Sequence, residues 1–207
     1  MSTKHLVFAI SLASSIALVA GLFMASEVRA GALEGGTQLP IEVEDLVEGA
    51  LDPSVLDQAQ AFDGEWVFVG GQREREGIDT AIAATLDALN PMIRGIAAKR
   101  LKESNPVPRR VTISVVGENA TISFDGDGHE AKLDGTPIKA VSTKGDKIKV
   151  SHKLKGSKLI QFIDGDGGDR HNHFRLNADG TRLSAKVMIT SDRLPVPVEY
   201  RLSFKRK

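Results

Sequence analysis

The chain has 207 residues, of which 41% are hydrophobic and 26% are charged, a balance typical of a globular protein long enough to bury a core. Its formal net charge is zero, so it lacks the excess positive charge with which nucleic-acid-binding proteins neutralise phosphates, and we expect no nucleic-acid partner. It contains no cysteine, which excludes disulfides, thiolate metal sites and cysteine nucleophiles.

The N-terminus has the pattern of an export signal. Lys4 precedes an uncharged, apolar stretch over residues 6–25, and small residues including Ala30 follow it. A basic start, an apolar segment and a small-residue exit are typical of a secretory signal peptide. We therefore predict a signal peptide over residues 1–30 and a mature protein outside the cytoplasm, periplasmic or secreted. The stretch is also long enough to span a bilayer, so an uncleaved N-terminal membrane anchor is the alternative.

Residues 31–61 are predicted to form an acidic linker followed by a short helix. Residues 31–65 contain nine acidic side chains and no basic one. The first ten of these residues are rich in glycine and lack a periodic apolar pattern, as flexible linkers do. Asp52-Pro53 then supplies an N-cap and a first-turn proline, which predicts the start of a helix.

The main domain is predicted to cover residues 62–207. A strand signal over residues 65–69 ends at two glycines. Two amphipathic helices are expected next, over residues 78–89 and 92–103, because apolar residues recur there at helical spacing. Asn90-Pro91 separates them, since asparagine can cap the second helix and proline fits its first turn.

After Arg109 the apolar period changes from helical to two. Val111, Ile113 and Val115 alternate with polar residues in the first of about nine such runs, which are separated by Asp-Gly and similar turn signals. With the strand before the helices, this makes about ten strands. Ten antiparallel strands in an open sheet would leave exposed edges, so closure is favoured. The predicted fold is mainly β with helices: an up-and-down antiparallel β-barrel of about 8–10 strands with a helix-turn-helix after the first strand.

The order of these elements resembles the fatty-acid-binding-protein branch of the lipocalin-like (calycin) β-barrels. Gly64 and Trp66 match the Gly-x-Trp opening of that branch's first strand, and the helix pair and the meander follow in the same order. The resemblance implies a barrel with an interior and a helical lid. Intracellular members hold a fatty-acid carboxylate with an Arg-x-Tyr pair on the last strand. Here Tyr200 lies on the apolar face and Arg201 on the other, so that clamp is absent.

Three residues are candidates for ligand binding inside the barrel. His152 falls in the middle of a strand on its apolar face, where an unpaired imidazole costs free energy. It is either a core histidine with a hydrogen-bond partner or, with Tyr200 and Trp66, part of a ligand cavity.

The second predicted helix and its exit are basic. Residues 94–110 contain six basic side chains against one acidic one. Four of the six form a predicted basic lid patch on the helix: Arg94, Lys99, Arg100 and Lys102. Such a patch fits an anionic membrane surface or an anionic ligand. The alternative is the solvated outer face of an amphipathic helix. We also consider that the acidic segment, residues 34–65, pairs with the basic stretch.

No catalytic or metal site is expected. His171 and His173 share one face of a predicted strand with Arg175, and a cation beside them disfavours a metal. The Asp-Gly runs lack the twelve-residue frame of a calcium loop and match hairpin turns. The chain also lacks Gly-x-Ser-x-Gly, a phosphate-binding loop and His-Glu-x-x-His. We therefore predict no enzyme activity, no metal and no cofactor.

The function predicted from these features is that of an exported, lipocalin-like protein. It would bind a hydrophobic small molecule, apolar or amphipathic, inside the barrel. The alternative is a non-catalytic structural or interaction protein of the cell envelope, with a barrel filled by its own side chains.

Overall fold

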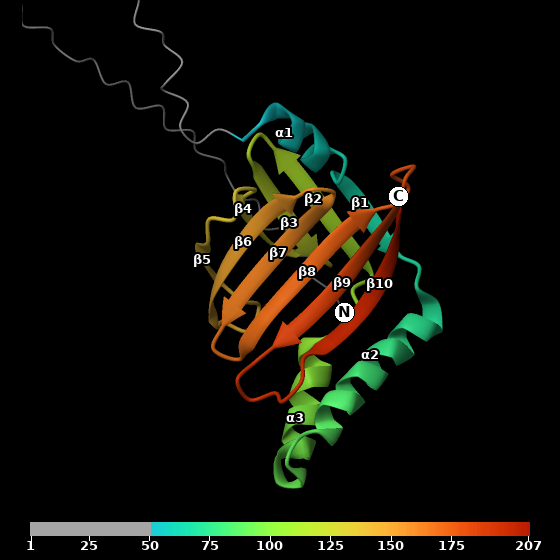
Figure 1. Cartoon of the computed structure of the whole chain (residues 1–207), viewed down its shortest axis with the longest axis vertical. Helices are drawn as coiled ribbons and strands as arrows, with labels where there is room; N and C mark the ends of the chain where they lie inside the picture. The colour runs from blue at the N-terminus through green and yellow to red at the C-terminus, as the bar shows by residue number, and fades with distance from the viewer. Residues whose placement is uncertain (1–50) are drawn as a thin grey trace, which may run out of the picture. The chain divides into compact units, whose positions relative to one another are not determined.

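The computed structural model describes residues 51–207, so the predicted signal peptide over residues 1–30 and most of the acidic linker lie outside the described residues. The described part contains three helices and ten antiparallel strands that curl into a nearly closed barrel (Figure 1). Within residues 51–207, every helix is too short or too polar to cross a membrane. The predicted fold is confirmed.

A short helix, α1 (Pro53–Gln60), covers one end of the barrel (Figure 1). It begins where Asp52-Pro53 predicts, and the Asp52 carboxylate accepts a hydrogen bond from the Ser54 backbone N–H at 2.8 Å. The Leu51 N–H donates to Glu118 Oε1 in the β2–β3 turn at 2.9 Å. Phe62, which follows the helix, is buried in the barrel core, and α1 therefore closes this end.

The helix pair lies at the other end of the barrel, after the first strand β1 (Gly64–Phe68). Its members are α2 (Gly71–Asp87) and α3 (Pro91–Ser104). The break at Asn90-Pro91 is as predicted, because the Asn90 side chain accepts from the Met92 N–H at 3.0 Å.

The predicted start of the first helix at residue 78 was wrong by seven residues. Glu74 explains the difference: its carboxylate accepts from the N–H and hydroxyl of Ser203 on β10 at 2.7 and 2.6 Å.

Nine strands follow the helices, the number that the alternation after Arg109 predicts. Their order in the sheet is β4-β3-β2-β1-β10-β9-β8-β7-β6-β5, and all neighbours are antiparallel. The strands are β2 (Arg110–Val116), β3 (Asn119–Phe124), β4 (Asp127–Lys132), β5 (Ile138–Val141), β6 (Lys147–Lys155), β7 (Lys158–Gly165), β8 (Gly168–Leu176), β9 (Arg182–Thr190) and β10 (Val198–Arg206).

The two edge strands of the sheet are β4 and β5, and the barrel closes where the segment after β4 reaches β6. The segment after β4 pairs with β6: Asp134 and Lys153 form an isolated antiparallel bridge, and the Gly135 N–H donates to the His152 carbonyl at 2.8 Å. Leu154 N–H donates to the Leu133 carbonyl at 3.2 Å. These bonds pair the part of the β6 edge that β5, which pairs with residues 147–150, leaves free.

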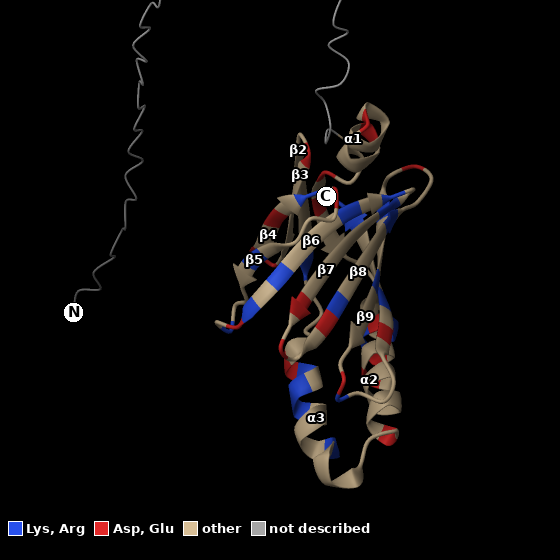
Figure 2. Ribbon diagram, turned by 60° about the vertical axis from the view of Figure 1, so that its left-hand side comes forward, with Lys and Arg blue, Asp and Glu red and all other residues tan. Residues whose placement is uncertain are grey.

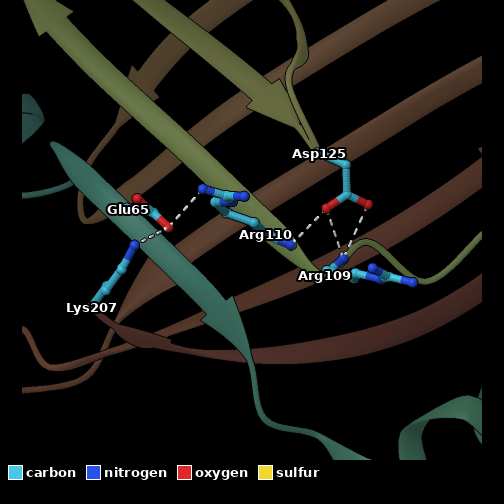
Figure 3. A network of polar contacts seen from close by, with 5 residues as sticks. All are labelled: Glu65, Arg109, Arg110, Asp125 and Lys207. Carbon is cyan, nitrogen blue, oxygen red and sulfur yellow. Dashed lines mark hydrogen bonds and ion pairs between the residues drawn. The ribbon is translucent and has the colours of Figure 1, made fainter. Parts of the chain in front are cut away.

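A charged network joins the exit of α3 to the first and third strands (Figure 3). Asp125, with φ of 52° in the β3–β4 turn, accepts from the backbone N–H groups of Arg109 and Arg110 at 2.9 to 3.1 Å. The Arg110 guanidinium and Lys207 Nζ lie 3.0 and 3.2 Å from Glu65 Oε1. Lys207, the larger influence, and Arg110 hold the pKa of Glu65 below its usual value. One acid of the acidic segment thus pairs with one base of the basic stretch.

The part of the interior that lies away from the helix pair is filled by large side chains. Trp66 is fully buried, its Nε1 donates to the Phe62 carbonyl at 3.0 Å, and the Arg206 guanidinium lies 4.2 Å from the ring centroid. Other fully buried residues of this packing are Phe174, Leu183, Leu202 and Phe204. Any space for a ligand must therefore lie nearer the helix pair.

Candidate functional site at the barrel mouth

A cavity of about 710 Å³ lies between α3 and the turns at the mouth of the barrel. Figure 2 shows α3 beyond the ends of the strands, with lysines and arginines on the helix. The volume is within the range of about 300–1,000 Å³ typical of small-molecule sites. Most of the wall is apolar, formed by Leu89, Ile93, Ile96, Ala97 and Leu101 of the helical region and Ile148, Ile163 and Leu194 of the barrel.

The charged residues that line this cavity are mainly cations. Four are basic and two acidic: Arg100, Lys144, Arg170 and Arg193 against Asp146 and Asp166. Lys144 Nζ lies 3.4 Å from Ser104 Oγ, which joins the β5–β6 turn to α3. An excess of positive charge around an apolar cavity raises the local concentration of anionic ligands.

A second cavity of about 290 Å³ lies between the α3 exit, the β3–β4 hairpin and the inner faces of β7 and β8. Phe124 and Gln161 are part of its wall. Both cavities are lined by Ser104, Ile163 and Arg170. Arg170 therefore stands where the two spaces adjoin.

The half-buried guanidinium of Arg170 has only neutral partners among residues 51–207. Its Nε donates to Asn172 Oδ1 at 3.0 Å, its Nη1 to Asn105 Oδ1 at 3.2 Å and its Nη2 to the Tyr200 hydroxyl at 3.3 Å. None of the ion pairs in this part of the chain involves Arg170. The guanidinium is held in place by hydrogen bonds to neutral groups, and no carboxylate of residues 51–207 forms an ion pair with it.

A row of buried polar side chains extends from Arg170 into the barrel. Asn172, Gln161 and His152 are each at most 1% exposed and lie opposite one another on β8, β7 and β6. Asn172 Nδ2 donates to Gln161 Oε1 at 2.8 Å, and Gln161 Nε2 and His152 Nε2 are 3.1 Å apart. His152 Nδ1 lies 2.9 Å from the Ala120 carbonyl.

The Ala120 carbonyl determines which atom donates in each hydrogen bond of the row. Because a carbonyl can only accept, Nδ1 of His152 carries the proton, and Nε2 accepts from Gln161. Every donor in the row therefore points from Arg170 toward Ala120, with an oxygen facing the guanidinium. This arrangement requires a neutral imidazole. Burial, reinforced by the charge of His129, lowers the pKa of His152 to about 4, so the imidazole is neutral near pH 7.

The structure places two of the three predicted ligand-binding residues on one inner row of side chains, with three strands between them. His152 and Tyr200 lie on the same inner row of side chains, since the register links β6, β7, β8, β9 and β10. Tyr200 also donates to Asn105 Oδ1 at 3.2 Å, and burial raises the pKa of its hydroxyl. Trp66 lies apart, beneath Arg206. None of the three lines either cavity, and their role in binding stays a prediction.

Of the predicted basic lid patch, Arg100 alone lines the mouth cavity. Arg94 donates to the Leu89 and Asp87 carbonyls at 2.9 Å each and so caps the end of α2. Lys99 lies 4.0 Å from Glu103, and Lys102 lies 3.6 Å from Asp79 on α2. The patch is therefore partly neutralised within the helix pair, and its contact with a membrane or ligand stays a prediction.

Arg170, Asn172, Gln161 and Asn105 were not among the residues singled out from the sequence. A signal for one of them was present: Arg170 follows the same two-residue period as Asn172, Phe174 and Leu176, which places it with them on the inner face of its strand. The partners of Arg170 could not be found in this way, because Asn105 is 65 residues distant and Tyr200 is 30 residues distant.

No family model matches the chain, and no curated protein matches it. Solved structures that resemble it include the fluorescent protein UnaG, at 15% identity over 72% of this chain and 99% of that one, with a TM-score of 0.46. Caenorhabditis elegans lipid binding protein 8 shows 14% identity over 72% and 96%, with a TM-score of 0.44. Echinococcus granulosus fatty-acid-binding protein 1 shows 14% identity over 71% and 98%, with a TM-score of 0.44.

The fold that the resemblance predicted is confirmed by the structure itself. One strand, a helix pair and nine further strands follow one another in a single antiparallel barrel.

Proposed function

We propose that this protein binds an amphipathic small molecule with an acidic head group, without catalysing a reaction on it. The ligand occupies the 710 Å³ cavity between α3 and the barrel mouth. The observation that carries the proposal is the Arg170 guanidinium, which lines an apolar cavity and has only neutral partners within residues 51–207.

An acidic head group suits this guanidinium for two reasons. A half-buried charge is costly without a counter-charge, and a ligand carboxylate would supply one. The planar guanidinium also presents its N–H groups in a fork that matches the two oxygens of a carboxylate. Its three bonds to Asn172, Asn105 and Tyr200 hold it in place before the ligand arrives.

The apolar walls suit a hydrocarbon tail. Ile93 and Ile96 line the cavity and are 47% and 62% exposed. A bound tail would remove this apolar surface from water, which contributes a favourable free energy of about 25 cal/mol per Å². The tail would lie in the outer part of the interior, because Trp66, Phe174 and Phe204 fill the rest.

We also propose that α3 is the part that meets an anionic membrane surface. Met92 is 89% exposed at the start of the helix, and Ile93 and Ile96 follow it. Lys99 and Arg100 lie one to two turns further along. Exposed apolar residues beside basic ones are typical of helices that touch anionic lipid surfaces. Vesicles of phosphatidylglycerol should accelerate ligand transfer, and Met92→Ser should reduce that effect.

An extracytoplasmic location is part of the proposal. It rests on the sequence pattern of residues 1–30, with the uncleaved anchor as the alternative. Expression of the full chain in a bacterium, followed by mass measurement of the product, distinguishes the two. Cleavage near Ala30 is expected; a full-length product in the membrane fraction would favour the anchor.

Binding can be tested with two probes that differ only in the head group, dodecanoate and dodecanol. We expect the protein to bind dodecanoate more tightly, and Arg170→Gln to reduce dodecanoate affinity while leaving dodecanol affinity nearly unchanged. Arg73→Gln is the matched control, because Arg73 is exposed on α2 and lines neither cavity. Circular dichroism checks that both variants fold.

Two results would contradict the proposal. Equal affinity of the wild type for both probes would show that Arg170 does not recognise an acidic head group. Absence of binding to either, together with no lipid seen by native mass spectrometry after mild purification, would favour the alternative of a packed barrel that serves as a structural or interaction protein.

A further inference from the structure

A shallow hollow of about 160 Å³ lies on the outer face of the barrel, across β7, β8, β9 and β10. Its wall is formed by Lys158, His173, Arg175, Ser184, Lys186 and Arg201. It shares no residue with the mouth cavity. Four of its six residues are lysine or arginine, and none is acidic, although the whole chain has a formal net charge of zero.

The strand register brings these cations side by side. Asn172 and Phe174 of β8 are buried in the barrel, so His173 and Arg175 face outward. His173 lies opposite Lys186 on β9, Lys186 lies opposite Arg201 on β10, and Arg175 lies opposite Ser184. Like charges directly opposite each other destabilise a sheet, and a bound anion would relieve that repulsion.

Few of these cations are neutralised by the protein itself. Lys186 Nζ lies 2.7 Å from Glu199 on β10. Within residues 51–207, Lys158, Arg175 and Arg201 form no ion pair. Burial lowers the pKa of His173, and the neighbouring charges of His171, Lys158, Lys186 and Arg175 lower it further. The hollow is therefore a site of uncompensated positive charge.

We propose that this hollow binds a single tetrahedral oxyanion of the phosphate or sulfate class. Arg175 and Arg201 would donate from their guanidinium groups, Lys158 would act as a point charge, and the Ser184 hydroxyl would donate a further hydrogen bond, while Lys186 stays paired with Glu199. A volume of about 160 Å³ fits one such group and does not fit a hydrocarbon chain. The group is either a free anion or the head group of a phospholipid.

Sulfate is the probe of choice, because its charge does not change between pH 5 and 8. The full chain is used, labelled with ¹⁵N for NMR. We expect sulfate to shift the signals of His173, Arg175 and Arg201. A bound anion stabilises the imidazolium, so saturation with sulfate should raise the pKa of His173.

The same linkage predicts how affinity depends on pH. The free protein holds the pKa of His173 low, through burial and the charges of His171, Lys158, Lys186 and Arg175. From β10, Arg201 faces the same hollow and Glu199 pairs with Lys186. Because the complex takes up a proton at His173, sulfate should bind more tightly at pH 5 than at pH 8. A His173→Gln variant should lose most of this dependence.

Arg175→Gln tests the site itself. Arg175 is exposed, so its loss should not prevent folding, and we expect sulfate affinity to fall about tenfold, as for loss of a charge-assisted hydrogen bond. Lys132→Gln on β4, which is exposed and lies outside the hollow, is the matched control. Unchanged affinity in Arg175→Gln, or an equal loss in Lys132→Gln, would overturn the proposal.

Vesicles distinguish the two sources of the anion. If phosphatidic acid vesicles bind the protein and Arg175→Gln weakens that binding more than it weakens sulfate binding, the head group of a lipid is favoured. If vesicles do not bind while sulfate and pyrophosphate do, a free anion is favoured. Tight binding of a DNA duplex with no response to sulfate or pyrophosphate would contradict a single-group site.

Discussion

Nε of Arg170 donates to Oδ1 of Asn172 across 3.0 Å, from one inward-facing position on β8 to the next. Through this bond the cation that lines the mouth cavity is joined to Gln161, His152 and finally the Ala120 carbonyl. The orientation of Arg170 thus depends on a buried row of neutral groups that is fully hydrogen-bonded. Buried side-chain polar atoms without a partner are absent from the part of the chain that the structure describes.

Removing the middle of this row should destabilise the protein. Asn172→Leu leaves the buried Gln161 and the half-buried Arg170 each without one partner, and an unsatisfied buried group costs about 1–3 kcal/mol, the half-buried one less. We expect the free energy of unfolding in urea to fall by about 2–4 kcal/mol and dodecanoate affinity to fall with it. Thr112→Ala, on the exposed face of β2, is the control. A loss below about 0.5 kcal/mol, the usual size for surface changes, would show that the row does not support the fold.

His152 should make stability depend on pH. Its pKa is about 4 in the folded state against an ordinary 6.5. Above about pH 7.5 the imidazole is neutral in both states, so it adds no dependence. As pH falls from 6.5 to about 4 the unfolded chain binds the proton and the folded one does not, so stability falls, by about 3 kcal/mol in total.

Urea unfolding at pH 7.5 and pH 4.5 measures this loss. His152→Gln replaces the imidazole by an amide that can also donate and accept but does not titrate. The variant should lose less stability on acidification than the wild type. An equal loss in both proteins would mean that other groups, such as His173, whose pKa is also lowered, account for the dependence.

Trp66→Phe separates packing from ligand binding. Trp66 is fully buried, donates to the Phe62 carbonyl and contacts the Arg206 guanidinium, but it lines neither cavity. We expect a loss of about 1–3 kcal/mol in the free energy of unfolding and unchanged affinity for dodecanoate. A loss of affinity with little loss of stability would instead support the sequence-based prediction that Trp66 binds the ligand.

Two glycines should respond to alanine in opposite directions. A Cβ at Gly128 would lie 2.7 Å from the Ser123 backbone Cα on the paired strand, so Gly128→Ala should destabilise the β3–β4 hairpin by about 1–3 kcal/mol. A Cβ at Gly95 in α3 would meet nothing within 4 Å. Gly95→Ala should therefore stabilise the protein by about 0.5–1 kcal/mol. Thermal unfolding followed by circular dichroism measures both, and a gain at Gly128 would contradict the close approach of β3 and β4.

Local signals in the sequence were sufficient for most of the fold. The two-residue alternation after Arg109 and the glycine turns are short-range features, and they predicted nine strands in an antiparallel meander. Asn90-Pro91 likewise predicted the boundary between α2 and α3. The start of α2 was misplaced because residues 72–77 are mostly polar and carry no amphipathic pattern. Their helix is supported by the bond from Ser203 to Glu74, 129 residues apart in the chain.

The sequence by itself determined that this protein is a β-rich barrel with helices after its first strand, because strand, turn and cap signals act over a few residues. Only the tertiary structure decided that large side chains fill the interior away from the helix pair and that space remains at the mouth, beside Arg170. The groups that surround Arg170 are set by the strand register and by the closure of the barrel. Register and closure bring together Arg170, Asn105 and Tyr200, residues that no local pattern connects.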